Sequence, residues 1–205
     1  MALSPENSTR DPGETRGRIL DAALEKFASK GYHSTRMDEI VAGSGTSKGA
    51  IYFHFPNKER LFLALVDQFA DLLERRVSAA IEDEAVGMRK VQAGLHACLD
   101  TFGNYRRPAK LLLVQAVGLG SSFEMKRMEV NDRFIDLIRG WLDEAIEVGD
   151  IQRVDSDVVA CAWMGAIYGV VIRWVYTGEP EPDRILSALL PVLLKSVGYV
   201  AAADE

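Results

Sequence analysis

The sequence is poor in the residues that build disulfide frameworks and metal centres. Its 205 residues include 2 cysteines and 3 histidines. Cys98 and Cys161 lie far apart, each in an apolar stretch, which predicts two buried thiols. The histidines, His33, His54 and His96, are dispersed and share no metal-ligand spacing. We therefore expect neither a metal site nor a cofactor.

Enzyme and membrane signatures are also missing. No GxSxG or HExxH motif occurs, and no strand pattern precedes Gly118-Leu119-Gly120, as a phosphate-binding loop would require. The stretch Ser4–Gly17 is polar and carries both charge signs, unlike a signal peptide. The apolar run Val158–Ile172 is shorter than the roughly 18 residues of a membrane span. These absences predict a cytoplasmic protein that is not an enzyme and does not enter a membrane.

Positive charge is not in excess, since the formal net charge is −6. The acidity is uneven, because residues 1–60 carry a net charge of +1 and the remainder carries −7. Attraction to phosphate depends on the local potential within roughly 10 Å and not on the total charge. An acidic protein of this kind is therefore compatible with a DNA-binding segment near its N-terminus.

Sustained period-two alternation is absent, and apolar residues instead recur every three or four positions. With 48% hydrophobic residues, the chain can bury a substantial core. The pattern predicts an all-α fold. The N-terminal helices are expected at 15–30 with Gly31 as the stop, from a Thr35 cap to Gly43–Gly45, from a Ser47 cap to Tyr52, and after Pro56-Asn57.

Further helices are expected in the C-terminal part of the chain. Gly149-Asp150 and Thr177–Pro180 are the clearest breaks between them. Pro191 falls inside the last helix, which should kink or restart there. The expected ranges are 85–103, 108–119, 123–148, 157–176 and 183–199.

Two short helices joined by a glycine-containing turn have the pattern of a helix-turn-helix, although any small bundle can contain such a pair. The specific signal is the run Thr35-Arg36-Met37-Asp38-Glu39-Ile40 followed by Ser47-Lys48-Gly49-Ala50-Ile51-Tyr52-Phe53-His54-Phe55-Pro56-Asn57-Lys58-Glu59. This run closely resembles the DNA-binding domain of the TetR (tetracycline-repressor) family. The detailed resemblance covers about residues 14–70, and beyond that the helix count and lengths match.

Two positions depart from the family pattern. Ser44 stands where the family usually has Ala, and Thr46 stands where an apolar Val is common. Each hydroxyl is expected near a buried turn, so it should find a backbone partner or cost about 1–3 kcal/mol. Neither departure changes the assignment.

The resemblance implies which residues contact DNA, and their chemistry fits. Thr35 and Ser47 stand at expected helix N-termini, where free N–H groups favour a phosphate oxygen. Lys48 can reach a guanine edge or a phosphate, and Gly49 allows a close approach. Thr35 and Ser47 could equally be plain caps, Tyr52 a core aromatic and His54 a surface residue. The predicted DNA-contacting set is Thr35, Arg36, Ser47, Lys48, Gly49, Tyr52, His54 and Lys58.

The resemblance further implies a flexible arm (1–14), a three-helix helix-turn-helix domain (15–60) and a helical ligand-binding and dimerisation domain (61–205). The family binds palindromic operators as homodimers, and repression relieved by a ligand is its norm. We expect the partner subunit to cover a second apolar stripe of the 157–176 helix, formed by Ala160, Met164, Tyr168, Val171 and Val175, together with part of the last helix. The predicted interface residues are Met164, Tyr168, Leu186, Leu189, Leu190 and Leu193.

Aromatic residues of the middle helices fall where the pocket of this family usually lies, although each could simply fill the core. Ligand sites are mainly apolar with a few placed polar groups, which predicts a hydrophobic effector such as an aromatic compound, a lipid or an acyl chain. An acyl thioester would be favoured if Arg106-Arg107 stood at a pocket mouth. The predicted ligand-binding set is Phe102, Tyr105, Met125, Phe134, Trp141, Trp163, His96 and Gln115.

One alternative stays open at this point. A helical adaptor could bind a protein partner through the apolar 158–172 run without binding DNA. Salt-sensitive binding to double-stranded DNA would separate this adaptor from a regulator.

Overall fold

The computed structural model describes residues 12–82, 87–111, 113 and 118–199. Within these residues the chain forms nine α-helices and no strand, which confirms the all-α prediction. The chain divides into two compact units, Met1–Leu65 and Val66–Glu205, so the division falls a few residues beyond the expected boundary at 60.

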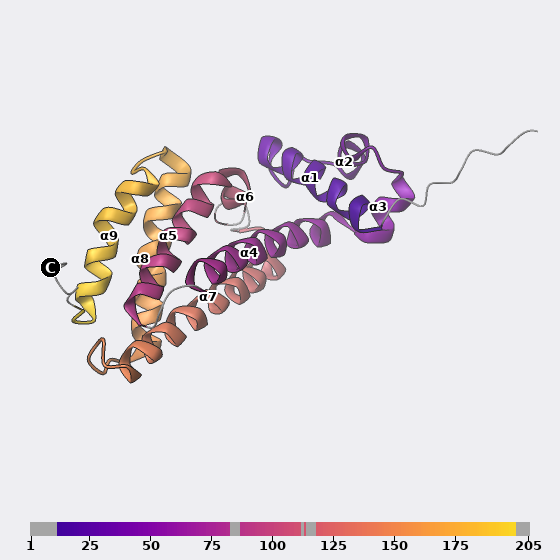
Figure 1. Ribbon diagram of the computed structural model, residues 1–205. Helices are drawn as coiled ribbons and strands as arrows, with labels where there is room; N and C mark the ends of the chain where they lie inside the picture. Colours follow the sequence, from indigo (N-terminus) through magenta and orange to yellow (C-terminus); the bar gives the residue numbers. More distant parts are fainter. Residues whose placement is uncertain (1–11, 83–86, 112, 114–117, 200–205) are drawn as a thin grey trace, which may run out of the picture. The chain divides into compact units, whose positions relative to one another are not determined.

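Unit 1 contains α1 (Pro12–Lys30), α2 (Met37–Ser44), α3 (Lys48–His54) and the first part of α4 (Lys58–Glu82) (Figure 1). Helix α1 packs against both α2 and α3. The core of the unit is apolar, and the rings of Phe27 and Phe62 meet edge to face at 5.3 Å between centroids. The largest fully buried side chains are Ile19, Leu20, Phe27, Ile40, Ile51, Leu61 and Phe62.

Local capping explains most helix ends in unit 1. Gly31 takes a left-handed conformation (φ 81°) directly after α1, as expected, and Gly45 does the same after α2 (φ 61°). The Ser47 hydroxyl accepts a hydrogen bond from the Ala50 N–H at 3.1 Å, which confirms Ser47 as the cap of α3. The expected Thr35 cap is wrong. The cap of α2 is Arg36, whose N–H donates to the Glu39 carboxylate at 2.9 Å.

The Ser44 hydroxyl has the backbone partner expected of it. It donates to the Val41 carbonyl at 3.0 Å, and it lies 2.7 Å from the Thr46 hydroxyl. The Thr46 N–H also donates to the Ser44 hydroxyl oxygen at 3.3 Å. The two departures from the family pattern therefore bond to each other and satisfy the turn between α2 and α3.

Unit 2 contains the rest of α4 with α5 (Met88–Asn104), α6 (Arg106–Lys110), α7 (Ser121–Glu147), α8 (Ser156–Thr177) and α9 (Pro182–Ser196). Helix α8 packs against α6, α7 and α9, and α5 packs against α7 and α9. Two ion-pair groups link α4 to α7. In one, Lys126 pairs with Asp67 at 3.0 Å. In the other, Arg133 pairs with Asp71 at 2.9 Å and also with Glu74.

Three helix expectations differ from the structure. Helix α5 starts at Met88, and the earlier residues 83–86 of the expected range lie outside the described residues. Helix α6 begins at Arg106, before the expected start at Pro108, and ends at Lys110, while residues 112 and 114–117 of the expected range 108–119 lie outside the described residues. Helix α9 runs through Pro191 without a restart.

Helix α8 is the most apolar helix of unit 2. Its 22 residues make it long and apolar enough to cross a membrane by length and composition alone, longer than the run identified in the sequence. The core helix of a soluble protein meets the same criterion. Ala160, Val171 and Val175 are buried inside the protomer, so the prediction that a partner subunit covers their stripe is wrong.

The two cysteines also differ from expectation. Cys161 is exposed on α8, so the prediction of a buried thiol is wrong there. Cys98 is half-buried and faces the cavity described below. Burial raises the pKa of its thiol to about 12.

Candidate functional site: DNA interface and ligand cavity

Helix α3 and its cap present four of the predicted DNA-contacting residues at the surface of unit 1, namely Ser47, Lys48, Gly49 and Tyr52. Ser47, Lys48 and Gly49 are exposed at its N-terminus, while Ile51 is buried and fixes the helix on the core. Tyr52 is 41% exposed and not a core aromatic. The first turn therefore offers free backbone N–H groups, a hydroxyl and an ammonium group to an approaching anion.

Lys48 has a partner that the sequence did not suggest. Its ammonium group pairs with the Asp38 carboxylate of α2 at 3.1 Å, and both side chains are largely exposed. The hydrogen bond to Asp38 raises the pKa of Lys48, so the side chain stays cationic. Water screens an exposed pair of this kind, so a phosphate can compete with Asp38 for Lys48.

Thr35 and Lys58 point into the domain. Thr35 is 1% exposed, and its hydroxyl donates to the carbonyls of Gly31 at 2.8 Å and Lys26 at 3.2 Å. The Lys58 ammonium group donates to the carbonyls of Tyr32 at 2.8 Å, Thr35 at 3.0 Å and His33 at 3.3 Å. It also lies 4.5 Å from the centre of the Tyr32 ring. Both side chains thus hold the turn between α1 and α2.

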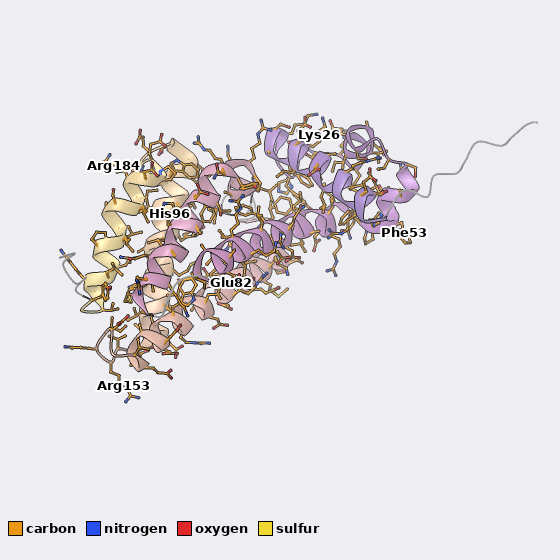
Figure 2. The ribbon with its side chains drawn as sticks, viewed as in Figure 1. Lys26, Phe53, Glu82, His96, Arg153 and Arg184 are labelled. Atoms are coloured by element: carbon orange, nitrogen blue, oxygen red, sulfur yellow. The ribbon has the colours of Figure 1, made fainter. Side chains whose placement is uncertain are left out.

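Phe53 is an exposed aromatic that the sequence analysis did not select. It is 83% exposed at the surface of unit 1 (Figure 2). Its ring meets that of His54, which is half-buried, at 5.2 Å between centroids. Arg36 is exposed beside the start of α2. An apolar ring in solvent beside Tyr52 was predictable, because the neighbouring buried position Ile51 sets the phase of α3.

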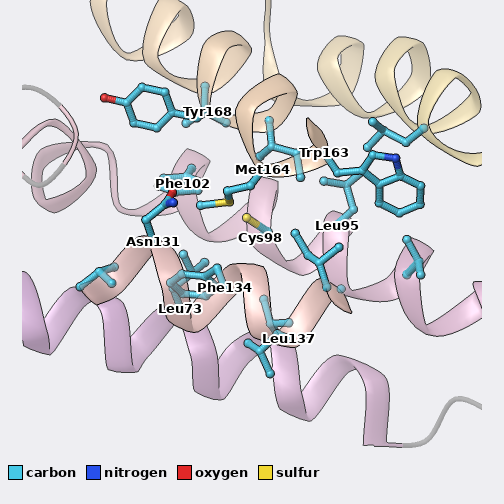
Figure 3. Close-up of a pocket in the computed structure, with 18 of the residues that line it drawn as sticks. Leu73, Leu95, Cys98, Phe102, Asn131, Phe134, Leu137, Trp163, Met164 and Tyr168 are labelled. Atoms are coloured by element: carbon cyan, nitrogen blue, oxygen red, sulfur yellow. The ribbon is translucent and has the colours of Figure 1, made fainter. Parts of the chain in front are cut away.

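Unit 2 contains a mostly apolar, partly open cavity of about 90 Å³ (Figure 3). Its walls come from α4, α5, α7, α8 and α9, with Leu113. Four of the predicted ligand-binding residues lie in the lining, namely Phe102, Phe134, Trp141 and Trp163.

The other predicted ligand-binding residues lie elsewhere. Tyr105 is the C-cap of α5, and its hydroxyl accepts a hydrogen bond from Arg76 at 3.3 Å. Met125 is 65% exposed and His96 is exposed, so neither lies in the lining. Gln115 lies outside the described residues.

The lining includes three polar groups, of which Arg127 and Asn131 were not expected from the sequence, whereas Tyr168 was expected near the pocket. Arg127 and Asn131 come from α7, and Tyr168, predicted for the dimer interface, comes from α8. The Tyr168 hydroxyl donates to the Leu113 carbonyl at 3.3 Å. Helical phase could have found the α7 pair, because Arg127, Asn131, Phe134, Ile138 and Trp141 follow one another at three- and four-residue steps.

Two tryptophans, Trp141 and Trp163, also line the cavity. The Trp163 indole N–H donates to the Ser196 hydroxyl of α9 at 3.0 Å, which fixes the ring between α8 and α9. Trp141 lies against Gly94 of α5, where an added Cβ would be only 2.8 Å from its Cη2 atom. Gly94 therefore leaves the space that the ring occupies.

The predicted interface residues are only partly exposed. Leu193 is buried, and Met164, Tyr168 and Leu193 all line the cavity. Leu186, Leu189 and Leu190 are half-buried on α9. A different apolar surface of α8 and α9 faces outward, formed by Val158, Ala162, Gly165, Gly169, Ala188 and Val192.

The comparisons with known proteins bear on the helix-turn-helix. Residues 19–65 match the family model of bacterial regulatory proteins of the TetR family. The chain is 26% identical to the HTH-type transcriptional regulator SrpR of Pseudomonas putida, over 83% of this chain and 78% of that protein. Residues 19–65 are a DNA-binding domain of the TetR family.

Two solved structures share the fold of this TetR-family regulator. The transcriptional regulator FadR of Bacillus subtilis in complex with stearoyl-CoA has a TM-score of 0.79 and 22% identity, over 90% of this chain and 98% of that one. AibR in complex with isovaleryl coenzyme A and operator DNA has a TM-score of 0.67 and 22% identity, over 87% and 97%. The relatives are DNA-binding regulators by name, which agrees with the predicted functional class.

Proposed function

We propose that this TetR-family regulator is a homodimeric repressor that binds a near-palindromic operator and is released by a hydrophobic small molecule. The observation that carries the proposal is a pair of features in one chain. Unit 1 presents the exposed first turn of α3, and unit 2 holds a partly open cavity whose wall is almost entirely apolar. The first suits a DNA groove, and the second suits an apolar ligand.

The cavity sets conditions on the effector. Pockets for drug-sized ligands measure about 300–1,000 Å³, so a volume of about 90 Å³ requires side chains to move as the ligand enters. Met164 and the leucines of the lining can change rotamer at low cost. FadR and AibR are described in complex with acyl-CoA molecules, whose acyl groups are apolar. That chemistry agrees with an apolar effector here.

In its described lining the cavity offers a CoA head group a single cation, Arg127. Neither Arg106 nor Arg107 belongs to the lining. The Arg106 guanidinium instead donates to the Val175 carbonyl at 3.2 Å and lies 5.2 Å from the centre of the Trp174 ring. The condition under which an acyl thioester was favoured is therefore not met.

One continuous helix, α4, takes part both in the cavity wall and in the DNA-binding unit. It contributes Leu73 and Val77 to the cavity wall, and the same helix begins at Lys58 in unit 1. A ligand that prefers the non-binding conformation by about 1.4 kcal/mol lowers DNA affinity tenfold. We propose that ligand entry displaces α4 and so changes the spacing of the two recognition helices.

The outward apolar surface of α8 and α9 is the proposed dimer interface. Small residues on α8, including Gly165 and Gly169, allow a second copy of the helix to approach closely. Covering this surface in the dimer would also account for an apolar helix without membrane insertion. A regulator of this kind acts on DNA, so we propose a cytoplasmic location.

The first prediction concerns α3. Lys48→Ala and Tyr52→Ala should each lower affinity for an operator, selected from random duplexes, by about tenfold or more at physiological salt. Both side chains are exposed, so thermal unfolding should be unchanged. Fluorescence anisotropy over a salt series gives the affinity and its salt dependence. Lys110→Ala removes an exposed cation from α6 and is the matched control.

Wild-type affinity in both variants would overturn the assignment of α3 as the recognition helix. Absence of any salt-sensitive binding by the wild-type protein would favour the DNA-free adaptor instead.

A further inference from the structure

The cavity of unit 2 has two chemically different ends. Its lining follows α7 from Arg127 to Trp141, which is about 21 Å at a rise of 1.5 Å per residue. Arg127 and Asn131 lie at one end of this stretch, and Trp141 lies at the other. In Figure 3, Asn131 and Tyr168 are toward one side of the cavity and Trp163 is toward the other. An elongated ligand would therefore bind in one preferred direction.

The polar end is rich in hydrogen-bond donors. Arg127 can only donate, and the amide of Asn131 carries two N–H donors beside its oxygen. In the described part of the chain, the Asn131 side chain makes no hydrogen bond. The Tyr168 hydroxyl donates to the Leu113 carbonyl over a long 3.3 Å, so a better acceptor nearby can draw it away. Neither Asp nor Glu belongs to the lining.

We propose that the effector is an apolar monocarboxylic acid, whose carboxylate is held by Arg127 and Asn131 and whose apolar part extends toward Trp141 and Trp163. The inference deepens the proposed function and depends on it. An ionised carboxylate is acceptor-only and matches the fork of a guanidinium group. A cationic head would meet Arg127 without a counter-ion from the lining, and a dianion would need a cluster of cations.

Arg127 already has one partner. Its Nε and Nη2 atoms both donate to Oε2 of Glu124, at 3.1 and 3.0 Å, while Oε1 of Glu124 accepts the Gly118 N–H at 3.0 Å. Both side chains of the pair are about one third exposed, at 36% and 37%. Water screens such a pair, so a ligand carboxylate can share Arg127 with Glu124. Other donors of the guanidinium group are left for the ligand.

The test compares molecules that differ only in their head group. Decanoic acid, 1-decanol, methyl decanoate and decanoyl-CoA are titrated into the full-length protein by calorimetry and tryptophan fluorescence. Decanoic acid should bind about tenfold or more tightly than the alcohol or the ester, because charge-assisted hydrogen bonds are about twice as strong as neutral ones. Trp141 and Trp163 lie in the lining and report entry of the chain.

Substitutions of Arg127 test whether this residue causes the preference for the acid over the alcohol. Arg127→Gln should bind the acid and the alcohol equally, and Arg127→Lys should retain part of the preference. Arg139→Gln is the control, because Arg139 lies on α7 outside the lining and pairs with Asp136 and Asp157. Circular dichroism confirms that each variant is folded.

Equal binding of acid and alcohol by the wild-type protein would overturn the carboxylate proposal while leaving the apolar cavity in place. Tighter binding of decanoyl-CoA than of decanoic acid, or an Arg127→Gln variant that keeps the acid preference, would overturn it as well. Failure of all four compounds to bind would overturn the apolar effector itself, and with it this inference.

Discussion

Polar residues of the helix-turn-helix either cap their own helix or bond to another helix, and the sequence alone does not tell these two roles apart. Ser47 was predictable as a cap, because a cap depends on a residue type and on the N–H group three positions later. Thr35 was not, since its hydroxyl bonds to carbonyls of α1, a contact between elements that spacing does not reveal. Arg36 is the cap of α2 instead, because its backbone N–H donates a hydrogen bond to the Glu39 carboxylate.

Lys58 gives a prediction at this scale. Its ammonium group bonds to three carbonyls and lies over the Tyr32 ring, so Lys58→Ala should leave these carbonyls without their donor. We expect a loss of about 1–3 kcal/mol in the free energy of unfolding. Chemical denaturation measures it, with Arg60→Ala as the control, because Arg60 is exposed on the same helix. Unchanged stability in Lys58→Ala would instead leave a direct phosphate contact as the role of this residue.

At the scale of helices, periodicity predicted the elements better than it predicted which face carries the site. The core stripe of α7 was readable from the sequence, and it places Phe134 and Trp141 in the cavity. Met125 precedes Phe134 by two and a half helical turns, so it lies on the opposite face and is exposed. The helical phase of α7 therefore excludes Met125 from the face that lines the cavity and includes Asn131 in it. No local pattern reports the packing that buries Ala160 and Val175 in the protomer.

The contact between α5 and α7 gives a prediction for these elements. A Cβ at position 94 would lie 2.8 Å from Cη2 and 3.1 Å from Cζ3 of Trp141, so Gly94→Ala should displace the indole ring. Gly to Ala in a helix usually stabilises by about 0.5–1 kcal/mol, and here we expect a lower melting temperature instead. Binding of apolar ligands should also change, since the ring is part of the cavity wall.

Gly140→Ala on α7 is the matched control. Nothing lies within 4 Å of an added Cβ there, so its melting temperature should rise slightly. Equal increases in both variants, measured by differential scanning calorimetry, would show that Trp141 is not confined by α5.

For the whole molecule, the proposed dimer rests on surface that a single chain leaves uncovered. The sequence could predict that the apolar helices α8 and α9 need a cover, but not which of their faces the protomer buries for itself. Leu193 illustrates the difference, because it is 4% exposed and a charge there would unfold the protomer. Val192 is 61% exposed on the same helix and is the better probe.

The last prediction uses Val192 together with the two cysteines. Val192→Glu should give a folded monomer by sedimentation, because it places a charge in the proposed dimer interface without disturbing the protomer core. Met128→Glu, at a position that is 58% exposed on α7, should remain dimeric.

Thiol labelling tests the same proposed interface through the two cysteines. In a wild-type dimer, a thiol reagent should modify Cys161 slowly, because the proposed interface covers α8. In Val192→Glu, the reagent should modify Cys161 rapidly. The reagent should modify Cys98 slowly in both proteins, because burial raises the pKa of its thiol to about 12 and leaves little thiolate at neutral pH. A wild-type monomer at micromolar concentration, or rapid labelling of Cys161 in a wild-type dimer, would contradict this interface.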